Sequence, residues 1–304
     1  MIEIECLWEC DDLLGESPIW NPADQALYWS DHAGPSLEFA GDRRPAMRRF
    51  NPRTGEQTSW PMPEQVGSFA FRDNGELLVG TNSGFCSLNL ETQRIERWVD
   101  PESDNPNSRL NDGKADRMGR YWCGSMDCQL QDKSARIYRL DPDRTVTSVA
   151  EDFTFVCSNG IAFDPDDTRM YFGDTKGGMI YVFDFDLESG TIENRRPFFN
   201  VSEYGAGIVD GATVDQEGYY WFALNLGGKI LRLAPDGKID RVIEMPVRSP
   251  TCVTFGGDDF DIMYVTSQQT FLTDEELTRH PRPGSIFAVH GLGVRGVPEP
   301  TFGG

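Results

Sequence analysis

The stretch SNGIAFDPDDTRMYFGDT, residues 158–175, is one copy of a phrase that recurs six times along this chain of 304 residues. Each copy starts with a polar or small residue and continues into an apolar-rich strand, an Asp/Asn/Gly turn and a second strand that ends near Gly or Thr. The other copies are GESPIWNPADQALYWSD (15–31), VGSFAFRDNGELLVGT (66–81), LNDGKADRMGRYWCGSMD (110–127), VDGATVDQEGYYWFALN (209–225) and PTCVTFGGDDFDIMYVTS (250–267). Such internal repetition predicts an architecture built from six similar units.

The repeat period identifies the unit. Matching the apolar residue four places later aligns one leading position in all copies: Glu16, Gly67, Asn111, Asn159, Asp210 and Thr251. The intervals are 51, 44, 48, 51 and 41 residues, and four strands with their turns need roughly 40 to 50 residues. We therefore expect an all-β fold: residues 1–304 form one six-bladed β-propeller domain with four-stranded blades.

Three segments lie outside the repeated phrases. The alternating segment 2–10 (IEIECLWEC) has no blade of its own, so we expect it to add a strand to the last blade and close the ring. The segment 271–284 is expected to include a helical turn. The long connection 32–49 (HAGPSLEFAGDRRPAMRR) is expected to be a lid or rim loop over the opening of the channel.

Composition narrows the classes of partner. The net charge of −21 repels phosphate backbones and anionic lipids, so we expect neither nucleic acid nor a membrane as partner. The N-terminus is acidic rather than signal-like, and the seven cysteines contain no CxxC pair. Several cysteines sit in apolar runs, which indicates reduced, mostly buried thiols and a cytoplasmic location.

The aligned position carries oxygen ligands in four of the six units. Equivalent positions on the innermost strands of a propeller converge on its axis, so Glu16, Asn111, Asn159 and Asp210 are expected to form a ring, while Gly67 and Thr251 leave room. Such a set suits Ca²⁺, Mg²⁺ or Mn²⁺; the absence of His and Cys argues against a tetrahedral structural zinc site. The alternative is that Asn-Gly and Asp-Gly simply make turns. That alternative does not explain why these elements and a Glu share one place in the repeat.

Other catalytic patterns are absent from the sequence. It contains no GxSxG, HExxH, Walker or helix-opening GxGxxG motif. His32, His280 and His290 lie far apart, and none occupies a ring position. A serine or cysteine triad is therefore a weak hypothesis. Trp20, Trp122 and Trp221 recur on inner strands, where packing between blades is favoured over stacking on a sugar.

At this point the chain resembles the SMP-30/gluconolactonase/regucalcin-like family. The motifs in register are GESPIW, RLNDGKADRMGRYWCGSM, SNGIAFDPDDTRMYFGDT, VDGATVDQEGYYWFAL and SPTCVTFGG. The resemblance implies a six-bladed propeller with one axial divalent metal ion (Ca²⁺, Mg²⁺, Mn²⁺, Zn²⁺ or Fe²⁺) and hydrolysis of an aldonolactone in sugar catabolism. By matching motifs it assigns Glu16, Asn159 and Asp210 as metal ligands, and Arg109 and Asn111 as substrate-binding residues.

The resemblance departs at one position and leaves two roles open. A carboxylate that some relatives carry falls near Gln129, for which Asp127 could substitute as a substrate contact. Asp210 is the candidate general base, or else only a ligand while a hydroxide on the metal attacks. Arg109 would orient the small-molecule sugar lactone. Competing functions are a promiscuous phosphotriester or lactone hydrolase, and a calcium-binding regulatory or structural propeller. The oligomeric state is not encoded in any pattern.

Overall fold

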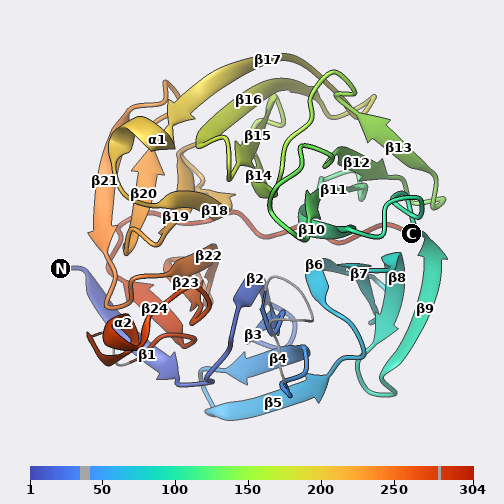
Figure 1. Ribbon diagram of the computed structural model, residues 1–304. Helices are drawn as coiled ribbons and strands as arrows, with labels where there is room; N and C mark the ends of the chain where they lie inside the picture. Colours follow the sequence, from blue (N-terminus) through green and yellow to red (C-terminus); the bar gives the residue numbers. More distant parts are fainter. Residues whose placement is uncertain (35–41, 280–281) are drawn as a thin grey trace.

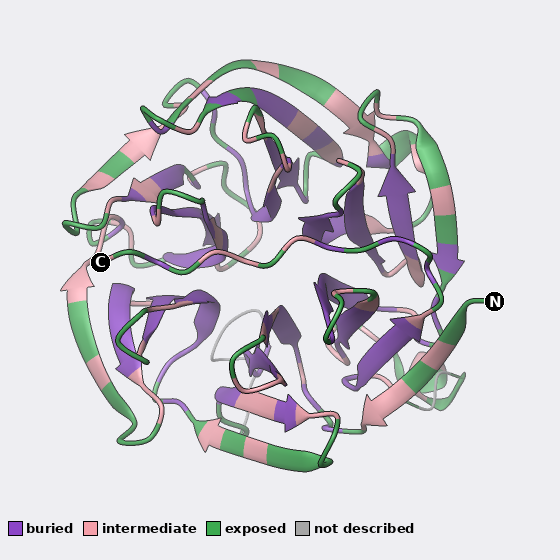
Figure 2. Ribbon diagram, turned by 180° about the vertical axis from the view of Figure 1, so that it is seen from behind, coloured by how far each residue is buried: buried purple, intermediate pink, exposed green. Residues whose placement is uncertain are grey.

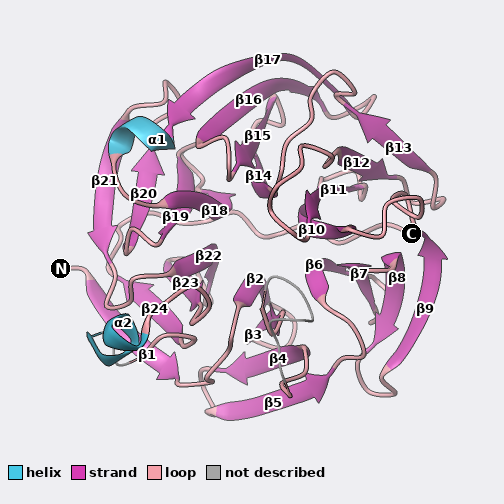
Figure 3. Ribbon diagram, in the orientation of Figure 1, coloured by secondary structure: helices cyan, strands magenta, loops and turns pink. Residues whose placement is uncertain are grey.

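The chain was analysed as a computed structural model that describes residues 1–34, 42–279 and 282–304. Within these residues the strands form six antiparallel sheets of four strands, arranged around a common centre (Figure 1). Apart from the strands there are two short helices, α1 (Val201–Tyr204) and α2 (Asp274–Arg279) (Figure 3). The predicted six-bladed propeller is therefore confirmed, as is the helical turn within 271–284.

Each blade has the same strand order, from the channel outward. The innermost strands of blades one to six are β2 (Gly15–Asn21), β6 (Val66–Phe71), β10 (Ser108–Ala115), β14 (Ser158–Phe163), β18 (Ile208–Val214) and β22 (Pro250–Gly256). The second strands are β3 (Ala26–Asp31), β7 (Leu77–Thr81), β11 (Tyr121–Asp127), β15 (Arg169–Asp174), β19 (Tyr220–Asn225) and β23 (Ile262–Ser267). The third strands are β4 (Ala46–Asn51), β8 (Gly84–Asn89), β12 (Ile137–Leu140), β16 (Met179–Asp186), β20 (Lys229–Leu233) and β24 (Ile286–His290). The outermost strands are β5 (Glu56–Pro61), β9 (Arg94–Val99), β13 (Val146–Val149), β17 (Thr191–Asn200), β21 (Ile239–Glu244) and β1 (Glu3–Trp8).

The ring closes through the N-terminal strand, as the sequence predicted. β1 pairs antiparallel with β24, so the last blade combines the first strand of the chain with three strands from its end. Closure in this way covers an edge that would otherwise be free to pair with another molecule. Of the predicted lid, residues 35–41 lie outside the described part of the chain, and Ala46–Asn51 is strand β4.

Every innermost strand carries a β-bulge at the aligned position. In all six blades the pairing register between the first and second strands shifts beside the residue that the repeat alignment singled out. A bulge bends the strand locally and re-aims the side chain it carries. The six leading residues are thus equivalent in structure, and the same distortion turns each of them relative to its blade.

Gly67 has a different role from the predicted one. A Cβ atom there would lie 2.4 Å from the carbonyl oxygen of Leu110 and 2.9 Å from that of Asn111, and the carbonyl of Gly67 itself accepts a hydrogen bond from the Ser17 hydroxyl at 2.9 Å. Backbone of the third blade therefore occupies the space that we expected Gly67 to leave for the channel. Glycine is needed here for close approach of two blades.

A repeated Asp–Trp contact fastens the turn between the first two strands. In blade five Asp215 accepts hydrogen bonds from two turn N–H groups, from Trp221 Nε1 (2.8 Å) and from Arg232 Nε (2.9 Å). In blade three Asp116 does the same with Trp122 Nε1 (2.9 Å) and its own turn. The spacing Asp-x₅-Trp thus binds a polar turn to the buried core, and no polar atom of the carboxylate is left unpaired.

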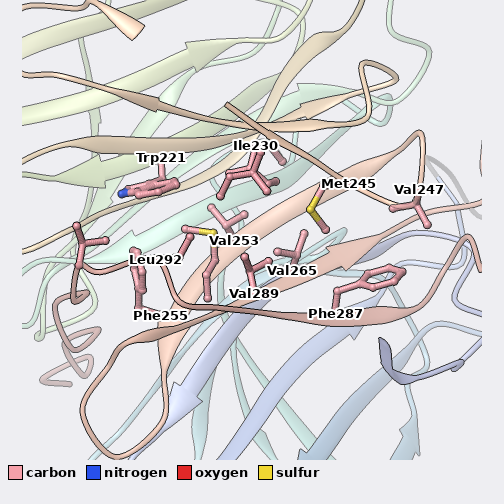
Figure 4. Close-up of a cluster of buried hydrophobic side chains, with 14 residues drawn as sticks. Trp221, Ile230, Met245, Val247, Val253, Phe255, Val265, Phe287, Val289 and Leu292 are labelled. Atoms are coloured by element: carbon pink, nitrogen blue, oxygen red, sulfur yellow. The ribbon is translucent and has the colours of Figure 1, made fainter. Parts of the chain in front are cut away.

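The core lies between adjacent blades. One cluster combines Trp221 and Ile230 of blade five with Val253, Phe255 and Phe287 of blade six (Figure 4). The predicted packing role of the tryptophans is confirmed, because Trp20, Trp122 and Trp221 are at most 3% exposed and belong to such clusters. All seven cysteines are free thiols, five of them buried. Within the described residues no helix is long and apolar enough to span a membrane.

The C-terminal segment 291–304 crosses one face of the ring, which the sequence did not predict. Its path from the last blade across the opening is visible in Figure 2. Gly296 bridges to Asp215 in blade five, and Phe302, fully buried, bridges to Arg72 in blade two. Between them Glu299 pairs with Lys114 at 2.7 Å. We call this segment the strap; it lies at the end of the channel where the innermost strands finish.

Candidate functional site

A cavity of about 300 Å³ opens at the other end of the channel, where the innermost strands begin. Its wall contains all five residues that the sequence placed near the axis, namely Glu16, Arg109, Asn111, Asn159 and Asp210. They come from blades one, three, four and five and converge because the bulges occur at the same height in each blade. The cavity wall is otherwise largely apolar, which is typical of a small-molecule site.

Two buried carboxyl groups face each other in this cavity. Glu16 and Asp210 are 8% and 5% exposed and lie within hydrogen-bonding reach of one another. Burial raises the pKa of each, and so does the nearby charge of Asp112. Among the described residues neither forms a salt bridge. Two acids in this position carry a surplus of negative potential that a cation would relieve.

The carboxamides are held in a chain of hydrogen bonds. Asn111 Nδ2 donates to the Ser158 carbonyl (2.8 Å) and to Asn159 Oδ1 (3.2 Å). Asn159 Nδ2 donates to Thr175 Oγ1 (2.9 Å), which in turn donates to the Val209 carbonyl (3.0 Å). These bonds determine the orientation of both amide groups. The Asn159 oxygen accepts only one of them, so it has a second lone pair available on the cavity side.

Arg109 lies fully inside the protein, against the wall of the cavity. It is 2% exposed, and its Nη1 donates to the Leu110 carbonyl (3.0 Å) and to Asn111 Oδ1 (2.8 Å). Burial lowers the pKa of the guanidinium, but an arginine side chain stays protonated in proteins. Its Nε has no hydrogen-bond partner among the described residues. A charged donor is therefore available at the cavity.

Asp127 is not brought into the cavity. It is the last residue of β11, and its carboxylate accepts hydrogen bonds from the N–H groups of Gln129 (3.3 Å), Gln131 (2.8 Å) and Asp132 (2.8 Å). Burial raises the pKa of this carboxylate, but the three hydrogen bonds together outweigh burial and hold the pKa below its ordinary value. The group holds the following loop, which places Leu130 on the cavity wall. Our prediction that Asp127 contacts a substrate therefore has no support in this geometry.

Sequence reasoning missed five polar residues of the cavity wall, one of which is the exposed Lys176. His32, Thr175 and Gln268 directly follow the second strands of blades one, four and six, and Asn225 is the last residue of that strand in blade five. The repeat itself contained the signal, because the end of each phrase returns to the same opening of the channel as its start. Aligning the ends of the phrases as well as their starts would have identified these positions.

Asn225 supports the acidic pair directly. Its Nδ2 donates to Asp210 Oδ2 at 2.7 Å, a bond that partly counteracts the rise in the pKa of Asp210. Its Oδ1 is buried and has no hydrogen-bond partner among the described residues. Such an orphaned oxygen beside two carboxyl groups requires either a donor or a cation.

The donor set fits a hard divalent cation. Within the described residues no three His, Cys, Asp or Glu side chains cluster in a metal-binding arrangement, so a site here must combine the two carboxylates with carboxamide oxygens. The unpartnered Asn225 oxygen and the unneutralised Glu16–Asp210 pair are the two observations that favour it. Oxygen-only sets of this composition suit Ca²⁺, Mg²⁺ and Mn²⁺ better than softer metals.

Comparison with known proteins extends over the whole chain. The 6-deoxy-6-sulfogluconolactonase of Pseudomonas putida is 34% identical over 301 residues, covering 99% of each protein. Regucalcin of Oryctolagus cuniculus is 34% identical over 309 residues, covering 100% of this chain and 99% of regucalcin. The crystal structure of a calcium-binding protein, regucalcin, from Agrobacterium tumefaciens superposes with a TM-score of 0.88 at 27% identity, covering 98% of this chain and 96% of that one.

The family follows from these matches together with the family model that covers most of the chain. The SMP-30/Gluconolactonase/LRE-like region matches residues 14–269, from Leu14, just before strand β2, to just beyond the hairpin of β22 and β23. That range includes all five predicted cavity residues and all six bulges. With the six-bladed fold and an axial cavity of acids and amides, the chain belongs to the SMP-30/gluconolactonase/LRE-like family.

Proposed function

We propose that this protein is a lactonase that opens the ring of a small sugar lactone with the help of one divalent cation. Lactone hydrolysis is supported by family membership and by the 34% identity to a sulfogluconolactonase across the full length of both proteins. The metal requirement is supported by the pair of buried carboxyl groups, Glu16 and Asp210, neither of which forms a salt bridge with a described residue.

Three side chains would hold the metal. Glu16 and Asp210 supply carboxylate oxygens, and Asn159 supplies a neutral amide oxygen. Their protonation is coupled to binding, since the carboxyl groups must lose any shared proton before both can act as ligands. When bound, the cation would polarise the lactone carbonyl and make a neighbouring water more acidic.

Three side chains would carry out proton transfer, stabilisation of negative charge and positioning. Asp210, oriented by the Asn225 amide at 2.7 Å, accepts a proton from the attacking water. Arg109 directs its free Nε–H toward the substrate and stabilises negative charge on the carbonyl oxygen. Asn111 fixes the guanidinium through its Oδ1 at 2.8 Å. The water oxygen bonds to the carbonyl carbon and the ring C–O bond breaks. The ring oxygen takes up the proton held by Asp210 and becomes a hydroxyl group, which gives an aldonic acid.

The metal requirement is tested by removal and return. Protein treated with EDTA and dialysed should lose hydrolysis of aldono-1,4- and aldono-1,5-lactones, and Ca²⁺, Mg²⁺, Mn²⁺, Zn²⁺ or Fe²⁺ added singly should restore it to different degrees. Metal content is measured in parallel by atomic emission. Undiminished turnover in protein shown to be free of metal would contradict the proposal.

The role of Asp210 is tested separately. Asp210→Asn should lower kcat by at least about a hundredfold, because the amide cannot accept the proton. Asp166→Asn is the matched control, since Asp166 is exposed on a hairpin turn. Circular dichroism of both variants reports on folding. If Asp210→Asn binds metal and turns over at the wild-type rate, Asp210 is only a replaceable ligand.

A calcium-binding role without catalysis is the second candidate. It is favoured by the likeness to regucalcins, one of which is described as a calcium-binding protein. A cavity of about 300 Å³ next to the carboxyl groups favours catalysis, because a purely structural ion needs no open volume beside it. Calcium-dependent stabilisation against heat with no turnover of any lactone would support the second candidate over the first.

A further inference from the structure

The wall of the cavity holds polar atoms that the proposed chemistry does not use. His32 is 1% exposed and neither ring nitrogen forms a hydrogen bond of normal geometry with the described residues. Gln268 is also 1% exposed, and its Oε1 is likewise unpartnered. Both side chains line the cavity. Buried polar groups without partners are costly, so their retention on a cavity wall points to a ligand that completes them.

The two residues form one sector of the wall. The His32 N–H donates to the Leu14 carbonyl at 2.9 Å, and Leu14 forms a bridge with Gln268. His32 thus lies on one side of Leu14, in blade one, and Gln268 lies on the other, in blade six. The backbone of His32 is held further by Gln65, whose Nε2 donates to its carbonyl at 3.0 Å. This sector is rigidly placed by main-chain contacts, which suits recognition of a fixed ligand shape.

His32 is held as a neutral imidazole. Burial lowers its pKa, and the charge of Arg109 lowers it further. One edge of the ring lies toward the backbone of Val66 and Gly67, whose carbonyls favour an N–H on that side. The opposite nitrogen then carries a lone pair. A neutral imidazole beside an arginine can accept a hydrogen bond from a hydroxyl group, which a second cation could not do.

The carboxamide of Gln268 complements this arrangement. An amide offers both a donor and an acceptor, and a sugar hydroxyl both donates and accepts. Most of the exposed area of the cavity wall is apolar, and Leu14 and Leu226 are among its residues. Polar groups that are few and fixed within an apolar wall orient a ligand rather than merely solvate it.

We propose that His32 and Gln268 bind hydroxyl groups of the substrate and make the cavity selective for polyhydroxylated lactones over lactones without hydroxyl groups. This inference rests on the proposed function, which supplies the lactone. A substrate that lacks the hydroxyls would leave the two side chains buried and unpaired, and a site of this kind discriminates strongly against such a substrate.

The experiment compares two lactones of the same ring size in metal-loaded protein. D-glucono-1,5-lactone carries hydroxyl groups, and δ-valerolactone carries none. In His32→Leu the ratio of kcat/KM for the two substrates should fall by about ten- to a hundredfold, with the loss mainly in KM for gluconolactone. His32→Asn, which can still accept a hydrogen bond, should restore part of the ratio, and Gln268→Leu should act in the same direction as His32→Leu. His290→Leu is the matched control, because His290 lies at the end of β24, the third strand of blade six, and does not line the cavity.

The outcomes separate this inference from the proposed function. If wild-type protein hydrolyses neither lactone in any metal, the proposed function fails, and binding of D-gluconate by calorimetry then tests the hydroxyl contacts alone. A drop in gluconate affinity in His32→Leu, but not in His290→Leu, supports the contacts. Equal losses for both lactones would assign His32 a structural role and overturn the inference, and so would an unchanged ratio together with unchanged gluconate affinity.

Discussion

Asn225 shows how much a single amide can contribute at this site. Its Nδ2 donates to Asp210 at 2.7 Å, while its Oδ1 is left without a partner. A hydrogen bond of this kind fixes the orientation of a carboxylate and determines which of its lone pairs faces the cavity. Outer contacts to metal ligands commonly change affinity or activity by one to two orders of magnitude.

Asn225→Ala should therefore weaken metal binding or lower kcat/KM by about 10- to 100-fold, without unfolding the protein. Calorimetric titration with Ca²⁺ or Mn²⁺ measures the affinity. Asn194→Ala is a matched control, because Asn194 also donates to an aspartate, Asp184, at 2.8 Å but on an exposed strand. Equal effects of both variants would show that the contact in the cavity has no special role.

The close approach of blades two and three at Gly67 can be tested by substitution. A methyl group there meets main-chain oxygens at 2.4 and 2.9 Å, which cannot move aside as a flexible side chain could. Gly67→Ala should lower the free energy of unfolding by about 1–3 kcal/mol, measured by urea denaturation. Gly303→Ala, whose added carbon would approach nothing closer than 3.6 Å, should leave that free energy unchanged.

At the scale of the element, an Asp–Trp contact fastens the hairpin turn in blades three and five. Asp215 satisfies the turn, the indole of Trp221 and the guanidinium of Arg232 at once. Arg232 is 4% exposed, so its charge depends on this carboxylate and on Asp240 at 2.9 Å. One side chain thereby couples a surface turn to the core between blades.

Asp215→Ala should destabilise the protein by about 3–5 kcal/mol, because it leaves a buried arginine with too few acceptors and a tryptophan N–H unpaired. Thermal or urea unfolding measures the loss. Asp236→Ala changes an exposed turn of the same blade, where Asp236 accepts from the Lys238 N–H at 3.1 Å. The control should cost less than about 1 kcal/mol. A small effect of Asp215→Ala would mean that the turn is stable without the hydrogen bonds of Asp215.

At the scale of the whole molecule, the strap joins blades that are distant in sequence. Glu299 forms a half-buried ion pair with Lys114, and Phe302 enters the core between blades two and three. The strap covers the end of the channel opposite the cavity. A ring of blades held only by neighbour contacts gains a diagonal connection in this way.

Glu299→Leu should destabilise the protein by about 1–3 kcal/mol, since the half-buried Lys114 keeps its charge with only the Ala212 carbonyl, at 3.2 Å, as acceptor. The double variant Lys114→Met/Glu299→Leu should recover most of this loss, because two apolar side chains replace the pair. Both are measured by urea unfolding against wild type. If the double variant is no more stable than the single one, the ion pair is not what Glu299 contributes.

The sequence by itself determined the propeller and the ring of axial residues. Six copies of one phrase imply six similar blades, and the same bulge in every innermost strand converts a shared place in the repeat into a shared height on the axis. The shared place in the repeat was therefore enough to predict that Glu16, Asn159 and Asp210 lie close together.

Only the tertiary structure decided what lies between the repeats. That Asp127 caps its own loop, that Gly67 admits the backbone of blade three, and that the strap carries Glu299 to Lys114 are contacts without a period in the sequence. The same holds for the unpartnered atoms of His32 and Gln268. Residues that recur in the repeat occupy equivalent positions in every blade, so their placement can be predicted from the sequence. These other contacts involve segments that occur once, and they depend on which segments become neighbours when the ring closes.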